Sequence, residues 1–177
     1  MAEILSPAGS WESMVAAVQN GADAVYMGVG TFNARRSAKN FSPEDFLAAV
    51  QYCHLRGAKV YLTVNITPHT DEYEALVRYF EEIADSGIDA LIVADVGVAT
   101  LAKEKLPHIP LHVSTQAGCV SHADCNFWHK FGATRVVLAR EVSFAEIAKI
   151  RSRISPELEL ETFIHGSMCV SFSGRCL

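Results

Sequence analysis

The sequence lacks a long hydrophobic run, an excess of positive charge and a leader-like N-terminus. No apolar stretch in the 177 residues approaches the ~20 residues that a membrane-spanning helix needs. The opening Met-Ala-Glu is not the basic region of a secretory signal. The formal net charge of -5 provides no overall positive field for nucleic acid or anionic lipid, so any nucleic-acid contact requires a local patch. These absences predict a cytoplasmic protein without a membrane span.

Paired cysteines are also missing. Five cysteines are an odd number, and without a secretory leader they argue against a disulfide framework. No spacing matches the C-x2-C of common zinc modules. Cys53 and Cys125 fall in apolar stripes of expected helices, which predicts core positions, whereas Cys119 follows an expected strand and its role stays open. Reduced thiols, metal ligands and catalytic thiols all remain as roles for the others.

The glycine-rich dinucleotide fingerprint is absent after the first strand, which disfavours an open nucleotide-binding sheet. What is present is an alternation of short apolar runs with longer amphipathic stretches, the pattern of parallel strands joined by helices. The expected strands are Glu3–Ser6, Ala24–Gly28, Lys59–Asn65, Ala90–Ala94, Leu111–Thr115, Arg135–Ala139 and Glu159–Ile164. The expected helices are Ser10–Asn20, Ser42–Arg56, Asp71–Ser86, Val96–Leu106, His122–Phe131 and Ser143–Ile154.

One helix-to-strand turn recurs four times, with Gly21, Gly57, Gly87 and Gly132 as helix stops. Repetition of one βα unit favours an α/β fold of the parallel (β/α) TIM-like barrel type. A complete eight-unit barrel takes ~250 residues. We therefore expect an incomplete barrel, with about seven of eight strands, in a single domain over residues 1–177.

Reacting groups of parallel α/β folds collect at the C-terminal ends of the strands. Asp95 and Glu141 at these ends are candidate acid/base groups, although Asp95 also suits the cap of the following helix. Arg35 and Arg36, with Lys39, form the one concentrated positive cluster near this face; they suit an anion clamp or a solvated loop. The other polar candidates there include Asn65, Gln116, Arg140, Glu161, His165 and Cys169.

The segment from Glu161 to Leu177, ETFIHGSMCVSFSGRCL, resembles the signature of the peptidase U32 (collagenase-like) family. The resemblance lies in the acidic residue, Phe163, Gly166, Cys169, Gly174 and Cys176 at the family's spacing; the signature's last residues are missing, so we expect the domain to be truncated within it. Further family-like segments are Leu5–Gly9, Gly21–Tyr26 and Arg135–Glu141.

The resemblance implies a barrel and several alternative activities. Some members are described as peptidases, and others carry out oxygen-independent hydroxylation of tRNA, of ribosomal RNA or of a ubiquinone precursor, with a [4Fe-4S] cluster on four cysteines. Cys169 and Cys176 match the first two cluster ligands, and the other two lie further downstream, so the isolated chain is expected to hold no cluster and to be inactive. Thiolates are suitable ligands for such a cluster.

The leading hypothesis is therefore the N-terminal barrel part of an iron–sulfur hydroxylase. Cys169 and Cys176 are the expected metal ligands, and His165 and Glu161 the expected pocket-shaping or proton-handling groups. The expected substrate-binding residues are Arg35, Arg36, Asn65, Gln116 and Arg140, for an acidic small-molecule co-substrate or RNA phosphate.

The alternatives are a peptidase hydrolase, in which Cys169 or another, unidentified group attacks the peptide bond, and a non-catalytic partner subunit. Exposed sheet edges at the first and seventh strands predict self-association, and the resemblance implies that pairing with another U32 chain is the other partner to expect.

Overall fold

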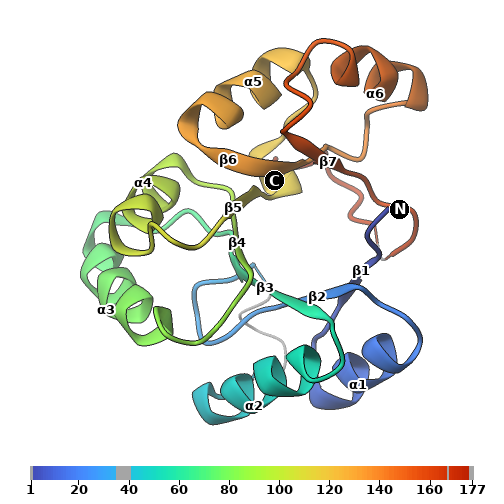
Figure 1. Cartoon of the computed structure of the whole chain (residues 1–177). Coiled ribbons are helices and arrows are strands. Elements are labelled where there is room, and N and C mark those ends of the chain that lie inside the picture. The colour runs from blue at the N-terminus through green and yellow to red at the C-terminus, as the bar shows by residue number, and fades with distance from the viewer. Residues whose placement is uncertain (1, 35–40, 167, 176–177) are drawn as a thin grey trace.

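Seven parallel strands, hydrogen-bonded in chain order, form a curled sheet in the computed structural model, which describes residues 2–34, 41–166 and 168–175. The strands are β1 (Leu5–Pro7), β2 (Ala24–Met27), β3 (Lys59–Val64), β4 (Ala90–Val93), β5 (Leu111–Val113), β6 (Ala133–Val137) and β7 (Glu159–Glu161). Figure 1 shows them curled around a common centre with the helices outside. Within the described residues β1 pairs only with β2, and β7 only with β6. The predicted incomplete barrel is confirmed.

Six α-helices connect the strands in the described part of the chain, and several of their ends lie at predicted capping residues. They are α1 (Trp11–Gln19), α2 (Pro43–His54), α3 (Tyr73–Ile83), α4 (Val96–Lys105), α5 (His122–Phe131) and α6 (Phe144–Arg151). Ser42 and Asp95 each accept a hydrogen bond from a first-turn N–H group, so the cap reading of Asp95 is confirmed. Gly132 ends α5 at φ 110°, a conformation that glycine adopts without strain. None of the helices in the described ranges combines the length and apolar character needed to cross a bilayer.

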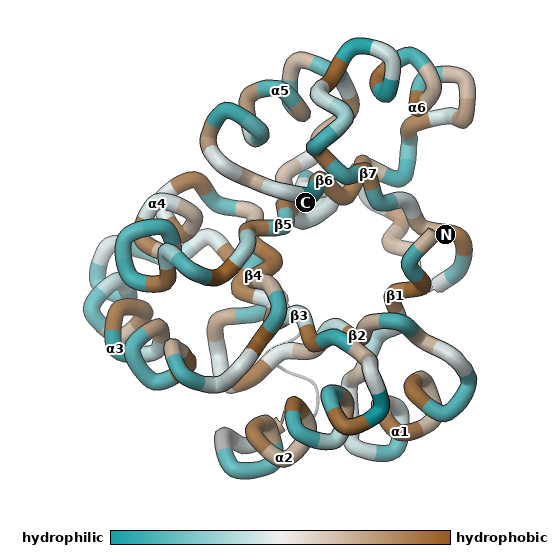
Figure 2. Tube along the Cα trace, viewed as in Figure 1, coloured by the Kyte–Doolittle hydropathy of each residue, from teal (hydrophilic) through white to brown (hydrophobic). Residues whose placement is uncertain are grey.

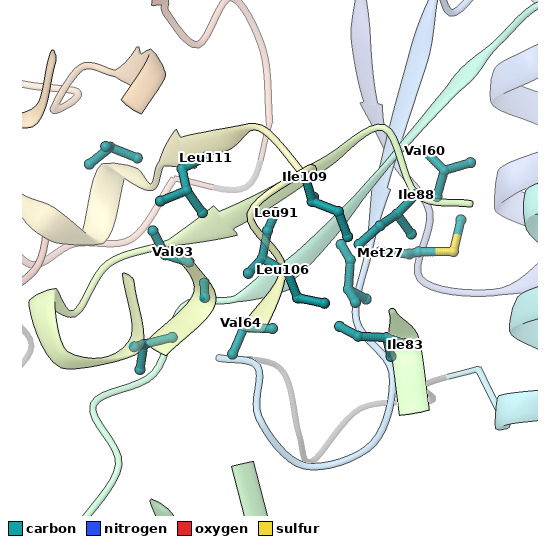
Figure 3. Close-up of a cluster of buried hydrophobic side chains, with 14 of the residues drawn as sticks. Met27, Val60, Val64, Ile83, Ile88, Leu91, Val93, Leu106, Ile109 and Leu111 are labelled. Atoms are coloured by element: carbon teal, nitrogen blue, oxygen red, sulfur yellow. The ribbon is translucent and has the colours of Figure 1, made fainter. Parts of the chain in front are cut away.

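The main core lies between the sheet and the helices. Outward-facing strand residues such as Val60, Leu62 and Leu91 are fully buried against helix residues such as Phe80. Figure 2 shows hydrophobic strands and helices whose polar sides face away from them. Figure 3 shows part of this layer, where Ile83 of α3 and Leu106 at the end of α4 pack with strand side chains. Because both layers are apolar, the hydrophobic effect holds the helices against the sheet.

The inward-facing strand residues are different in kind. A small apolar cluster contains Ala24, Tyr61, Ala90 and Ile92, with Leu5 and Tyr26 packed beside it. The same side carries the buried polar residues His112, Ser114 and Arg135. The interior of the curled sheet is therefore part apolar and part ionic, and it opens at the C-terminal strand ends.

All seven predicted strands differ from the observed ones at one end or both; the first, for example, runs from Leu5 to Pro7 instead of from Glu3 to Ser6. The sixth begins at Ala133 instead of Arg135 and ends at Val137, because its pairing with β5 shifts register after Leu111. The seventh was expected to reach Ile164, but it ends at Glu161 because β6 offers pairing partners only up to Val137. Ile164 is consequently exposed.

Candidate active site

A cavity of ≈ 570 Å³ opens at the C-terminal ends of the strands, where sequence reasoning expected the site. It is bounded by the segments that follow β1, β2, β3, β5 and β6, and by the tail after β7. Its polar and aromatic lining includes Tyr26, Asn33, Asn65, Ser114, Thr115, Gln116, Arg140, Glu161, Phe163, Cys169, Phe172 and Ser173. The volume is in the range of small-molecule and cofactor sites.

Asn65 joins three loops at the rim of the cavity. Its Oδ1 accepts a hydrogen bond from the N–H of Ala34 at 3.1 Å, and its Nδ2 donates to Oγ of Ser114 at 3.4 Å. The same Ser114 oxygen accepts from the N–H of Gln116 at 3.2 Å. These bonds fix the loops after β2, β3 and β5 relative to one another, while Gln116 itself is exposed and lines the cavity.

Arg140, in the loop after β6, holds the tail over the cavity. Its guanidinium donates to Oγ of Ser173 at 3.1 Å, to the carbonyl of Cys169 at 2.6 Å and to the carbonyl of Ser171 at 2.7 Å. Glu141 adds a bond from the other side by accepting the N–H of Ser173 at 3.0 Å. Hydrogen bonds with a charged partner are the stronger kind, so these bonds anchor residues 169–173 to the barrel.

Two glycines allow the tail to approach the barrel. Gly118 ends the short 3-10 helix η2 (Thr115–Ala117) at φ 67°, and Gly174 lies in the tail at φ 76°. A Cβ atom on Gly174 would overlap the carbonyl oxygen of Gln116. This backbone contact requires glycine.

Glu161 and Cys169 are the two chemically reactive groups on the cavity wall. Burial raises the pKa of Glu161, although Arg135 at 3.4 Å acts to lower it. Cys169 is exposed, and its Sγ accepts the N–H of Ser171 at 3.4 Å. By contrast Cys53, Cys119 and Cys125 are buried, and burial raises their pKa values to about 11, about 12 and about 11. Only Cys169, among the four described cysteines, is placed to react or bind a ligand.

The comparisons with known proteins identify the family. The model of peptidase family U32 matches residues 9–177. The chain belongs to peptidase family U32. This U32 chain is 41% identical over 175 residues to tRNA hydroxylation protein P of Escherichia coli, covering 99% of this chain and 38% of the relative.

A second relative and a solved structure fit the same family. The 23S rRNA 5-hydroxycytidine C2501 synthase of Escherichia coli is 39% identical over 174 residues, which are 98% of this chain and 26% of that protein. The structure of the U32 peptidase Mk0906 superposes with a TM-score of 0.73 at 19% identity, covering 92% of this chain and 68% of that chain. At that identity it supports the barrel fold alone. The U32 chain thus spans well under half of these two curated relatives.

The structure brings together five of the predicted U32 site residues, since the cavity lining includes Asn65, Gln116, Arg140, Glu161 and Cys169. His165 is exposed and is not among the lining residues. Arg35, Arg36 and Cys176 lie outside the described residues. The two residues before the arginines, Asn33 and Ala34, do line the cavity.

Sequence reasoning missed the aromatic residues of the cavity lining, which are Tyr26, Phe163 and Phe172. For Tyr26 the period-2 alternation of β2 was a usable signal, because Val25 and Met27 belong to the outer core. For Phe172 no local pattern was available, since the tail's position depends on Arg140.

The donor set for a metal is incomplete in the part of the chain that the structure describes, where no group of three or more His, Cys, Asp or Glu residues is arranged to hold a metal ion. Cys169 fits the chemistry of one cluster ligand, because its sulfur is exposed and accepts a backbone N–H group. Cys176 lies outside the described residues.

Proposed function

We propose that this domain forms the substrate-binding barrel of an RNA-hydroxylating enzyme and takes up a pyrimidine base at the cavity. One observation carries the proposal: a half-buried carboxyl group, Glu161, and an exposed thiol, Cys169, open on a cavity that is also lined by amide and aromatic side chains. The printed activities of the two Escherichia coli relatives, tRNA hydroxylation and 5-hydroxycytidine synthesis, agree with such a substrate.

The cavity has the groups that recognise an unstacked base. Tyr26, Phe163 and Phe172 offer aromatic surfaces for stacking, and the amide of Gln116 both donates and accepts hydrogen bonds. Asn65 is already committed to Ala34 and Ser114, so in this proposal it shapes the cavity instead of reading the base. Arg35 and Arg36, which follow the cavity-lining Ala34, are the proposed contacts for RNA phosphate or an acidic co-substrate.

In the same proposal Cys169 and Cys176 supply two of the four ligands of a [4Fe-4S] cluster, which would supply electron transfer beside the bound base. Arg140 positions Cys169 by binding its carbonyl oxygen. Glu161 holds or moves a proton at its carboxyl group. His165, exposed and away from the cavity lining, remains the weaker proton-handling candidate.

The proposed substrate also implies a location and disfavours a rival. In this proposal the enzyme works in the cytoplasm, which agrees with the reduced thiols of the buried Cys53, Cys119 and Cys125. The peptidase alternative has less support, because a cysteine nucleophile needs a neighbouring base and His165 does not line the cavity with Cys169. Peptide cleavage that is lost in Cys169→Ala and survives chelation of iron would favour it.

The test uses the full-length protein in a bacterial host whose own genes for the tRNA hydroxylation protein and for the 23S rRNA 5-hydroxycytidine synthase have been deleted. We expect mass spectrometry of digested RNA to show a pyrimidine nucleoside that has gained one oxygen atom. Cys169→Ser should abolish this product, whereas Val170→Ser, a substitution at the adjacent exposed residue that does not line the cavity, should retain it. RNA without any hydroxylated pyrimidine would refute the proposed function.

A further inference from the structure

Arg135 lies inside the barrel, between three carboxylates that come from both edges of the sheet. Its side chain is only 9% exposed. Its Nη1 donates a hydrogen bond to a carboxylate oxygen of Glu3, in the N-terminal segment, at 2.6 Å. Its Nε and Nη2 donate to one carboxylate oxygen of Glu159, in β7, at 2.8 and 2.6 Å. Glu161 accepts only a long hydrogen bond of 3.4 Å from the same Nη1, which already donates to Glu3 at 2.6 Å. One guanidinium therefore binds three carboxyl groups, and Glu161, the one on the cavity wall, has the longest hydrogen bond to it.

Glu3 competes effectively because it has additional partners. Its second oxygen accepts from Nζ of Lys59 at 3.0 Å, and its first accepts from the hydroxyl of Tyr61 at 2.8 Å. Glu159 competes by binding two guanidinium nitrogens through one oxygen. Hydrogen bonds to a charged group stabilise its ionised form, and Glu3 and Glu159 take the short hydrogen bonds of Arg135 while Glu161 is left with the long one.

We infer that Glu3 and Glu159, by occupying Arg135, are positioning residues that hold Glu161 as a neutral carboxyl group able to donate a hydrogen bond into the cavity. The pKa of Glu161 is raised by burial, opposed by Arg135 and further raised by the charges of Glu3 and Glu159. Three carboxyl groups surround the single guanidinium of Arg135. Ionising the third costs more free energy than ionising the first two, because like charges disfavour each other's ionised form.

Among the residues that the structure describes, the other groups around Glu161 do not supply a second dedicated cation. His112 of β5 has its pKa lowered by burial, and then by Arg135, to about 3, so its ring is neutral at ordinary pH. The guanidinium of Arg140 is bound to the tail and Lys59 to Glu3. The titratable and charged groups that face this region from the surrounding elements are Glu3, Tyr26, Lys59, Tyr61, His112, Arg135, Arg140, Glu159 and Cys169.

A neutral carboxyl group gives the cavity a recognition element that a carboxylate lacks. It donates through its O–H and accepts through its C=O, so it can pair with a ring carbonyl next to a ring N–H, or with a ring nitrogen next to an amino group. Both patterns occur on pyrimidine bases. This part of the inference rests on the proposed function, whereas the protonation state of Glu161 does not.

The experiment is infrared difference spectroscopy of the full-length protein over a pH series. The neutral-carboxyl band that disappears in Glu161→Gln belongs to Glu161, and its loss with rising pH gives the ionisation midpoint. We expect a midpoint above the ordinary glutamate value of about 4.3. Glu159→Gln frees Arg135 for Glu161 and should lower the midpoint by roughly one pH unit or more. The Glu159→Gln substitution should disturb the packing of the protein little, because the Glu159 side chain is 60% exposed.

Glu157→Gln is the matched control, because it removes the same charge from an exposed residue two positions earlier and should leave the midpoint unchanged. A wild-type midpoint at or below about 4.3, or a raised midpoint that Glu159→Gln does not move, would overturn the inference. If the band behaves as expected while RNA is not hydroxylated, the proposed function fails and the Arg135 arrangement stands. If RNA is hydroxylated but the carboxyl band does not behave as expected, the inference about Glu161 fails and the proposed function stands.

Discussion

Arg140 donates two hydrogen bonds to Oγ of Ser173, from its backbone N–H at 3.3 Å and from Nε at 3.1 Å. The Ser173 hydroxyl therefore contacts both the backbone and the side chain of Arg140, in the loop after β6. Ser173 is buried, although its neighbours Phe172 and Gly174 are exposed. The contact fixes the tail at one point and makes one wall of the cavity dependent on residues that are distant in the sequence.

Replacing Arg140 with alanine should release the tail without unfolding the barrel. The change removes charge-assisted bonds to Ser173, Cys169 and Ser171, and we expect a loss of about 2–3 kcal/mol of local stability. Hydrogen exchange at the amide of Ser173 should accelerate strongly. Arg153→Ala, at an exposed arginine with no side-chain bond to the tail in the described structure, is the control. Equal exchange rates in the two variants would show that Arg140 does not anchor the tail.

Gly174→Ala should disturb the same wall for a steric reason. The new methyl group would overlap the carbonyl oxygen of Gln116, and the positive φ of 76° adds strain for any residue with a Cβ. We expect a destabilisation of about 1–3 kcal/mol or detachment of the tail. Gly9→Ala, where no atom lies within 4 Å of the added Cβ, should change the unfolding midpoint little. Similar urea midpoints for both variants would contradict the close approach.

Glu3 should make the fold sensitive to acid. Burial raises its pKa, but hydrogen bonds from Arg135, Tyr61 and Lys59 outweigh this and lower it from 4.5 to about 2. Because the folded pKa is depressed, the stabilisation is complete above about pH 4.5 and is lost as the pH falls toward 2. The shift corresponds to about 3 kcal/mol. Urea unfolding at several pH values should show this loss in the wild type and a smaller one in Glu3→Gln; parallel curves would refute it.

The described cysteines should differ sharply in reactivity. Cys169 is exposed, whereas Cys53, Cys119 and Cys125 are buried with raised pKa values and hold almost no thiolate near neutral pH. Alkylation of the native protein with iodoacetamide, followed by peptide mass spectrometry, should label Cys169 first. The three buried thiols should react only after denaturation. Rapid labelling of Cys119 in the native state would contradict its burial.

Much of the architecture was readable from local patterns. The order of strands and helices, the Asp95 cap and the Gly132 stop each depend on a few neighbouring residues, and all were confirmed. The ends of β6 and β7 were predicted wrongly, because a strand ends where its partner stops pairing. Phe163 and Ile164 are apolar enough for a strand but have no pairing partner in the described structure.

The amino-acid sequence by itself determined the alternation of βα units, the family signature and the end of the barrel at which the candidate residues gather, since each follows from periodicity or from contiguous residues. The tertiary structure decided which of those residues share a cavity and what charge surrounds them. Arg140 was predicted to bind substrate, yet its guanidinium binds the tail of its own chain, 29 to 33 residues away. Arg135 read as an ordinary strand residue, and only the curl of the sheet brings Glu3, 132 positions earlier, to its guanidinium. Such contacts depend on long-range geometry that no local pattern encodes.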